Sequence, residues 1–237
     1  MGYTSHIGRV GALAVALGIG AGLVATPWAA SANPGNGTGN GQNLSISKDG
    51  VVKVQKGTAT ATSDAGSTAK AMGVNSTATA TVGTGNTATV KGDNSTATAT
   101  GGNNNTATAT ANSTAGAFNG DNNTATADNG SAFAAYGDNN TATATANGYA
   151  LAYAGDNNTA TADNGYALAF NGDNNTATAT DNSSAAAGSG DNNTATATDN
   201  SGATAGSGDS NTAIATCGGS ANATGGGATD TKNGGSC

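Results

Sequence analysis

The chain of 237 residues has little of what most enzymes and most protein cores are built from. It contains no Glu, a single His (His6), a single Arg (Arg9) and a single Trp (Trp28), and only 9% of its residues are charged. Beyond residue 32 it therefore has no His or Glu from which to assemble a His-based zinc site, a Ser-His-Asp triad or a Cys-His pair. These absences argue against a conventional enzyme.

Long hydrophobic runs are also missing, except over residues 10–25. This run follows Arg9 and precedes the small-residue site Ala30-Ser31-Ala32, the pattern of a secretory signal peptide over residues 1–32 with cleavage between Ala32 and Asn33. A run of this length falls short of the roughly 20 residues of a membrane span, so we expect no transmembrane segment after cleavage. The leader resembles those of exported mycobacterial proteins, which implies a secreted, extracellular or envelope-associated protein.

Basic residues are scarce, and the formal net charge is −7. All 14 acidic residues are Asp, and the few Lys are scattered. A phosphate-binding surface needs clustered Lys and Arg, so nucleic acid is not an expected partner and an acidic membrane surface is disfavoured.

A short repeat fills most of the remaining chain, most clearly as Gly-Asp-Asn-Asn-Thr-Ala-Thr-Ala, and its later copies are alternately 17 and 18 residues apart. Alternation of Thr and Ala is a strand pattern, and the Asn, Asp and Gly between the runs favour turns. A weaker copy lies midway, so each repeat holds two strands. Residues 58–216 are therefore predicted to form an all-β fold, a two-sheet β-solenoid of about 17–18 residues per coil and about nine coils. The alternative is a largely disordered, low-complexity chain, because hydrophobicity is low and Gly is abundant.

Two arrangements of the core are open. Ala keeps one phase in both half-coils, as at Ala142 and Ala144 against Ala150, Ala152 and Ala154, which favours Ala inside. The inverse would bury larger side chains in the middle coils, namely Tyr149, Leu151, Tyr153, Tyr166, Leu168 and Phe170.

The two ends of the array differ from the repeats. Residues 33–43 are a Gly-rich linker, and residues 44–57 predict a capping hairpin because two β-branched runs meet at Asp49-Gly50. Residues 217–237 are expected to be a Gly-rich tail closed by a disulfide between Cys217 and Cys237, since two Cys in an exported chain usually pair. Free thiols that crosslink two chains are the alternative.

Two outward surfaces are candidates for function. Thr-x-Thr runs recur from about Thr96 to Thr198 and would stack into a flat grid that is similar to the ice-binding faces of solenoid antifreeze proteins; its members are Thr124, Thr126, Thr141, Thr143, Thr145, Thr159, Thr161, Thr176, Thr178, Thr180, Thr194, Thr196 and Thr198. Aromatic and Leu side chains cluster in the opposite half-coils and would form an interaction patch, or a thick core if buried; they are Phe118, Phe133, Tyr136, Tyr149, Leu151, Tyr153, Tyr166, Leu168 and Phe170.

One Asp per Gly-Asp-Asn-Asn turn would form a column along an edge of the solenoid. Calcium-binding β-rolls also use nine-residue half-coils, but their glycine framework is missing here. Asx turns are the favoured role of these Asp, and we expect no metal and no cofactor.

The Asn-x-Thr-Ala-Thr-Ala units over residues 58–216 loosely resemble head repeats of trimeric autotransporter adhesins, which implies a surface-exposed adhesive rod. The C-terminal membrane anchor of that family is not found after the repeats. The leading hypothesis is an exported, non-enzymatic repeat protein with a structural or adhesive role, whose partner is an unknown envelope component or another copy. The other hypotheses are an ice-binding protein and a carbohydrate-active enzyme that uses paired Asp.

Overall fold

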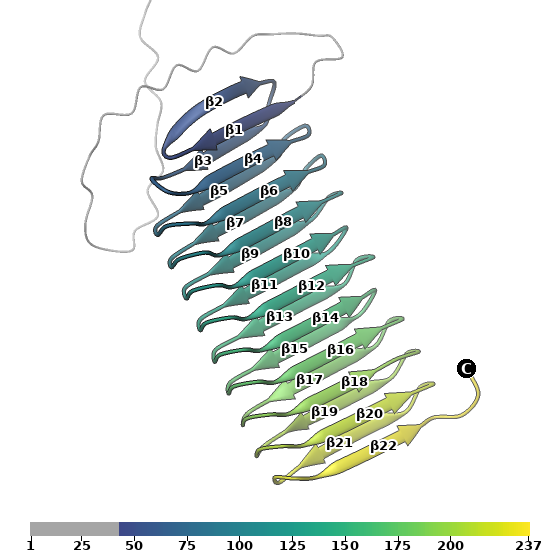
Figure 1. Ribbon diagram of the computed structural model, residues 1–237. Helices are drawn as coiled ribbons and strands as arrows, with labels where there is room; N and C mark the ends of the chain where they lie inside the picture. The colour runs from purple at the N-terminus through teal and green to yellow at the C-terminus, as the bar shows by residue number, and fades with distance from the viewer. Residues whose placement is uncertain (1–42) are drawn as a thin grey trace, which may run out of the picture. The chain divides into compact units, whose positions relative to one another are not determined.

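The computed structural model describes residues 43–237, which form strands and turns without a helix (Figure 1). The all-β prediction is confirmed, and the disordered alternative is wrong for this part of the chain. The expected signal peptide (1–32), its cleavage site between Ala32 and Asn33, and all but the last residue of the linker (33–43) lie outside the described residues.

The strands form two long sheets, here called sheet A and sheet B (Figure 1). Each of the ten strands of sheet B is followed along the chain by a strand of sheet A, which gives ten coils. Sheet A has twelve strands in the order β2 (Val51–Lys56), β1 (Leu44–Lys48), β4 (Thr68–Met72), β6 (Thr87–Lys91), β8 (Thr106–Thr110), β10 (Thr124–Asp128), β12 (Thr141–Thr145), β14 (Thr159–Asp163), β16 (Thr176–Thr180), β18 (Thr194–Ala197), β20 (Thr212–Thr216) and β22 (Thr229–Asn233).

Sheet B is parallel throughout and holds the intervening strands. In chain order these are β3 (Thr60–Ser63), β5 (Thr77–Thr81), β7 (Thr96–Thr100), β9 (Thr114–Phe118), β11 (Ser131–Ala135), β13 (Tyr149–Tyr153), β15 (Tyr166–Phe170), β17 (Ser184–Gly188), β19 (Gly202–Gly206) and β21 (Ser220–Thr224).

The core between the sheets is built almost entirely of Ala. Ala142 and Ala144 of β12 and Ala150 and Ala152 of β13 are all fully buried, so the prediction of Ala inside is confirmed and the inverted core is wrong. Ala154 does not share this role, because it lies in the turn after β13 with a left-handed backbone (φ 57°). Each buried methyl contributes only about 0.8 kcal/mol, so stability comes from repetition of a small contribution.

The alternation of 17 and 18 residues originates in the turns from sheet A to sheet B. Asn129 and Gly130 alone join β10 to β11, whereas three residues, Ala146 to Gly148, join β12 to β13. Asn129 and Asn147 both adopt left-handed φ angles of 52° and 67°, which Asn tolerates better than other residues with a Cβ atom. One residue more or less is thus absorbed in the turn while both sheets keep their register.

The turns from sheet B to sheet A contain a ladder of fully buried Asn side chains. The Asn158 backbone N–H donates to Asn140 Oδ1 over 2.9 Å, and Asn140 Nδ2 donates to the Gly155 carbonyl over 2.8 Å. Equivalent backbone-to-Oδ1 bonds run from Asn86 to Asn211. Glycine is required beside the ladder, since a Cβ atom at Gly137 (φ 151°) would collide with the Gly155 carbonyl oxygen.

The N-terminal end of the array is covered by a hairpin (Figure 1). β1 pairs antiparallel with both β2 and β4, and Asp49 and Gly50 form the left-handed turn between β1 and β2. β1 also covers the open edge of sheet B, because the hydroxyl oxygens of its buried Ser45 and Ser47 accept the Ala61 and Ser63 N–H groups at 3.0 and 3.1 Å.

At the C-terminal end the solenoid runs further than predicted, because β21 and β22 form a tenth coil within residues 217–237. In β22, Asp230 and Lys232 occupy the register positions of the core residues Ala213 and Ala215. Asp230 Oδ2 accepts the edge N–H of Asn222 at 2.8 Å, and Asp230 Oδ1 lies 3.5 Å from Lys232 Nζ. The hydrogen bond from Asn222 holds the pKa of the Asp230 carboxyl below its usual value. Charged groups directed toward the core position of a terminal strand oppose end-to-end stacking of solenoids.

Candidate functional site

The outward residues of the strands are the variable part of each coil. On sheet A, Thr side chains form two columns in which every member faces its neighbour in register. The first contains Thr106, Thr124, Thr141, Thr159, Thr176 and Thr194, and the second contains Thr108, Thr126, Thr143, Thr161, Thr178 and Thr196. Ideal sheet dimensions place neighbouring Thr about 6.8 Å apart along a strand and about 4.8 Å apart between strands.

The third outward position of sheet A is not a pure Thr column. Thr110, Asp128, Thr145, Asp163 and Thr180 alternate there. The Thr110 and Thr145 hydroxyls donate to Asp128 Oδ1 and Asp163 Oδ1 over 2.8 and 3.0 Å. Thr198 lies just beyond the end of β18. The uninterrupted Thr surface is therefore two columns wide, narrower than the grid expected from the sequence.

The Thr runs at the start of the array also divide between the two faces. Thr96 to Thr100 form β7 on sheet B, whereas Thr106 to Thr110 form β8 on sheet A. The prediction of one face beginning near Thr96 is therefore wrong at its start. The 10-residue step between these two runs is a half-coil, not a full coil.

The aromatic residues predicted to cluster do lie together, all on sheet B or in the turn beside it. β9, β11, β13 and β15 are successive strands of this sheet, and they carry every residue of the predicted patch except Tyr136, which follows β11. We call the following set the aromatic patch: Phe118, Phe133, Tyr136, Tyr149, Leu151, Tyr153, Tyr166, Leu168 and Phe170. Its strand residues alternate with the buried Ala and therefore project away from the core, and Tyr136 lies in the turn after β11 with a left-handed backbone (φ 57°).

Small residues at outward positions let the aromatic rings lie close to the sheet. Carbon atoms of Phe118 and Phe133 lie 2.7 and 2.9 Å from where a Cβ atom of Gly116 would be, and a ring carbon of Phe170 lies 3.0 Å from that of Gly188. Ala135 is an outward residue, yet it is 1% exposed. This close packing of rings against the sheet was not predicted from the sequence, although the Gly residues in the outward phase of β9 and β17 indicated it.

The rings of the aromatic patch contact one another across neighbouring coils. Ring centroids are 4.9 Å apart in the near-parallel pair Tyr149–Tyr166 and in the edge-to-face pair Tyr136–Tyr153. They are 6.1 Å apart in the pairs Phe118–Tyr136 and Phe133–Tyr149. Tyr136, Tyr153 and Tyr166 are nevertheless 51%, 37% and 44% exposed. Partial burial raises the pKa of the Tyr149 phenol, and the nearby Tyr166 phenol raises it further.

The Asp column lies along the edge where sheet B turns into sheet A. Each carboxylate accepts a backbone N–H from the preceding coil, as Asp138 Oδ1 does from Asp121 and Asp156 Oδ1 does from Asp138, both at 2.7 Å. The column therefore ties neighbouring coils together, whereas the sequence favoured Asx bonds within one turn. These contacts account for one oxygen of each carboxylate without a metal ion.

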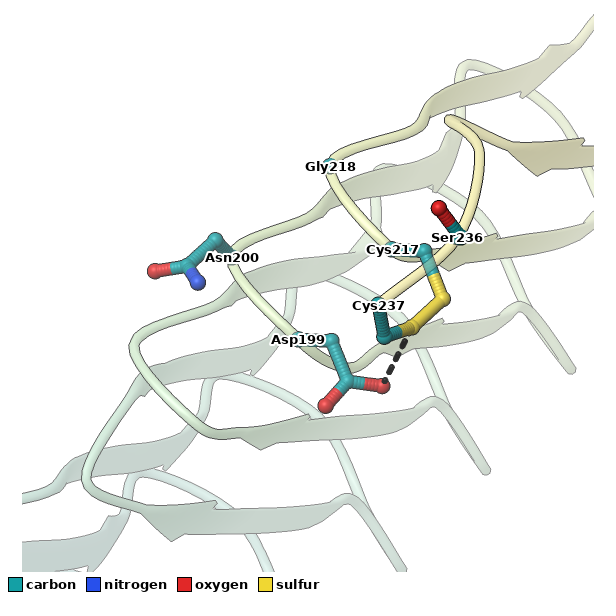
Figure 2. Close-up of a pocket in the computed structure, with 6 residues that line it drawn as sticks. All are labelled: Asp199, Asn200, Cys217, Gly218, Ser236 and Cys237. Atoms are coloured by element: carbon teal, nitrogen blue, oxygen red, sulfur yellow. Dashed lines mark hydrogen bonds between the residues drawn. A yellow bond between two sulfur atoms is a disulfide. The ribbon is translucent and has the colours of Figure 1, made fainter.

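Cys217 and Cys237 form a disulfide with their Cα atoms 5.0 Å apart, and residues 43–237 contain no free cysteine. Figure 2 shows that Asp199, Asn200 and Gly218 lie beside it around a shallow hollow. Asp199 Oδ2 is 3.6 Å from Cys237 Sγ, a contact in which the oxidised sulfur has no proton to donate. Because neither sulfur is a thiolate, this cluster offers a metal only one carboxylate.

A second shallow hollow lies beside the aromatic patch and is lined by Asn112, Asn129, Gly130, Ser131, Asn147, Gly148 and Tyr149. Glycoside hydrolysis generally uses two facing carboxyl groups, and neither hollow contains such a pair.

Residues 43–237 contain no helix long and apolar enough to cross a membrane. Comparison of the chain with protein-family models, with curated proteins and with solved structures found no match. The chemistry of the two outward faces is therefore the main indication of function.

Proposed function

We propose that the chain is an exported, non-enzymatic structural or interaction protein that acts at or outside the cell envelope. In this proposal the aromatic patch is the docking surface, and its partner is an envelope component or another copy of the chain. The solenoid serves as a rigid scaffold that holds the patch on one face.

The main support for this proposal is that sheet B forms the same strands elsewhere without aromatic side chains. Sheet B has Thr at the corresponding outward positions in β5 and β7, and Ser, Ala and Gly in β17. The large rings on four successive strands expose apolar surface to water, which is energetically unfavourable. Such exposed apolar patches are typical of interaction surfaces.

Replacement of the three most exposed rings tests this role. The triple variant Tyr136→Ser, Tyr153→Ser and Tyr166→Ser should release the exported protein from the envelope fraction, or convert its oligomer to monomer in sedimentation. Circular dichroism should show unchanged strand content, because these side chains lie outside the Ala core. The matched control is Thr143→Ser, Thr161→Ser and Thr178→Ser on sheet A, which should leave retention and assembly unchanged.

Unchanged retention and assembly of the Tyr variant would contradict the docking role. Equal release by the control variant would also contradict it, because the effect would then not depend on the aromatic face.

The two Thr columns favour ice binding as a second candidate. Both columns continue to Thr87 and Thr89 of β6, so they are unbroken from β6 to β18. Ice recognition requires a flat, regular surface of this kind. Thr143→Tyr, Thr161→Tyr and Thr178→Tyr should then abolish thermal hysteresis, whereas the Tyr-to-Ser variant above should retain it. Absence of hysteresis in the wild-type protein would eliminate this candidate.

A further inference from the structure

The tyrosines of sheet B form two close pairs that connect neighbouring coils. Residues 43–237 contain four tyrosines, and every one belongs to a pair whose ring centroids lie 4.9 Å apart. Tyr136 pairs with Tyr153, and Tyr149 pairs with Tyr166. β13 carries one member of each pair, so the pairs link three successive coils through β11, β13 and β15.

The backbone fixes both pairs. Tyr149 and Tyr166 are register partners on adjacent parallel strands. Tyr136 is held at the end of β11 by bonds to both neighbouring coils: its N–H donates to the Phe118 carbonyl over 3.2 Å, and its carbonyl accepts the Gly155 N–H at 3.1 Å. The close approach of the rings is therefore a consequence of coil stacking and persists as long as the solenoid is folded.

The paired rings are also the most accessible targets for one-electron oxidation in this part of the chain. Residues 43–237 contain no Trp and no His, their two Cys form the disulfide, and their single Met is Met72 on β4 of sheet A. Tyr136, Tyr153 and Tyr166 each expose more than a third of their surface to solvent. A tyrosyl radical formed on one ring has a second phenol as its nearest redox partner.

We propose that each tyrosine pair is a site of oxidative coupling to 3,3′-dityrosine, driven by hydrogen peroxide and a one-electron oxidant of the peroxidase class. Each phenol loses one electron and one proton, and the two ortho carbons join. Both rings then lose their ortho hydrogen to the phenolic oxygens and regain aromaticity. Two phenols thus give one biaryl, two protons and two electrons, and these reduce one peroxide to two waters.

The two crosslinks would join three successive coils of the solenoid covalently. Each coil of an Ala core contributes little to stability through packing. A covalent crosslink between neighbouring coils adds stability by restricting the unfolded chain. Coupling is a property of the isolated protein and does not require the docking role proposed above.

Treatment of the dilute, purified protein with horseradish-type peroxidase and hydrogen peroxide tests the inference. The monomer band should acquire dityrosine fluorescence, intact mass should fall by four hydrogen atoms, and the melting temperature should rise. Tyr153→Phe and Tyr166→Phe should each lose one of the two crosslinks. The double variant should lose both, although Tyr136 and Tyr149 are still present.

Three results would overturn the proposal. They are fluorescence only in multimers, a monomer whose mass is unchanged, and a double variant that still gives intramolecular dityrosine. Unchanged envelope retention and assembly of the Tyr-to-Ser variant, together with normal coupling in the wild type, would contradict the docking role alone, so the two proposals fail separately.

Discussion

β12 and β13 belong to neighbouring half-coils and share one interior, yet they present opposite chemistry to solvent. Ala142 and Ala144 of β12 and Ala150 and Ala152 of β13 are equally buried. The outward residues of β12 are Thr, whereas β13 carries two Tyr and a Leu. The inward phase and the turns therefore specify this fold, and the outward phase is free to carry function.

Exchanging the two faces should have the largest effect. Deletion of residues 149–158 places Thr159 where Tyr149 was, so the inward phase of Ala is kept but every later strand changes sheets. Turns of unequal length then fall on the wrong edges and the Asn ladder is interrupted. We expect a loss above about 4 kcal/mol or failure to fold, measured by urea denaturation.

Deletion of a whole coil is the matched control. Removing residues 141–158 brings β14 into the place of β12 and β15 into the place of β13, so both faces and the Asn ladder continue. The shortened protein should fold cooperatively, because a solenoid tolerates loss of a repeat better than loss of register. Equal damage from both deletions would show that the coil is not the structural unit.

Enlarging one inward residue should have the next largest effect. Ala142→Leu adds volume between two sheets that are spaced for methyl groups, and overpacking of this kind costs about 1–3 kcal/mol. Thr143→Leu makes the same residue one position further along β12, where it projects outward, and should change stability by less than about 0.5 kcal/mol. Thermal and urea denaturation of the pair give the difference. Similar losses in both variants would contradict the inward and outward assignment.

A smaller loss should follow removal of one amide from the buried ladder. Asn158→Ala removes the donor to the Gly172 carbonyl and the acceptor for the Asn175 N–H, and leaving such buried groups unpaired costs about 1–3 kcal/mol. Asn157→Gly is the control, because Asn157 is exposed and left-handed, a conformation that Gly adopts readily. Equal urea midpoints for the two variants would show that the Asn ladder does not contribute to stability.

The fold was predictable because its signals repeat. Alternation of Thr and Ala sets the strand phase, Asn, Asp and Gly mark the turns, and an error in one coil is corrected by the next. Constant small residues in one phase also identified Ala142 and its equivalents as core. The ends were less predictable, since Asp230 and Lys232 take the core register only once, and no repetition identifies their role.

The candidate site was predictable in place but not in detail. The outward phase placed Tyr149, Tyr153 and Tyr166 on one face. The pairing of their rings and the support from Gly116 and Gly188 depend on register between coils, which 17- and 18-residue spacings leave open. Asp128 and Asp163 could be recognised in the sequence as departures from Thr. That they interrupt one column of the Thr surface is known only from the alignment of β10 and β14 with β12.

The smallest expected effect is a difference in how the stability of variants on the two faces depends on pH. Burial and the neighbouring Tyr166 phenol raise the pKa of Tyr149 above its ordinary value of about 10, so the folded state holds this proton more tightly than the unfolded state. The resulting contribution to stability is complete below pH 10 and is lost as the pH rises through the higher folded pKa. Urea denaturation at pH 9 and pH 11 should therefore show a steeper alkaline loss for the wild type than for Tyr149→Phe, which has no proton to lose. Thr143→Ser on the opposite face should follow the wild type, because it leaves Tyr149 and its surroundings unchanged. A Tyr149→Phe variant with the wild-type pH dependence would show that the aromatic face does not hold this phenol in its neutral form.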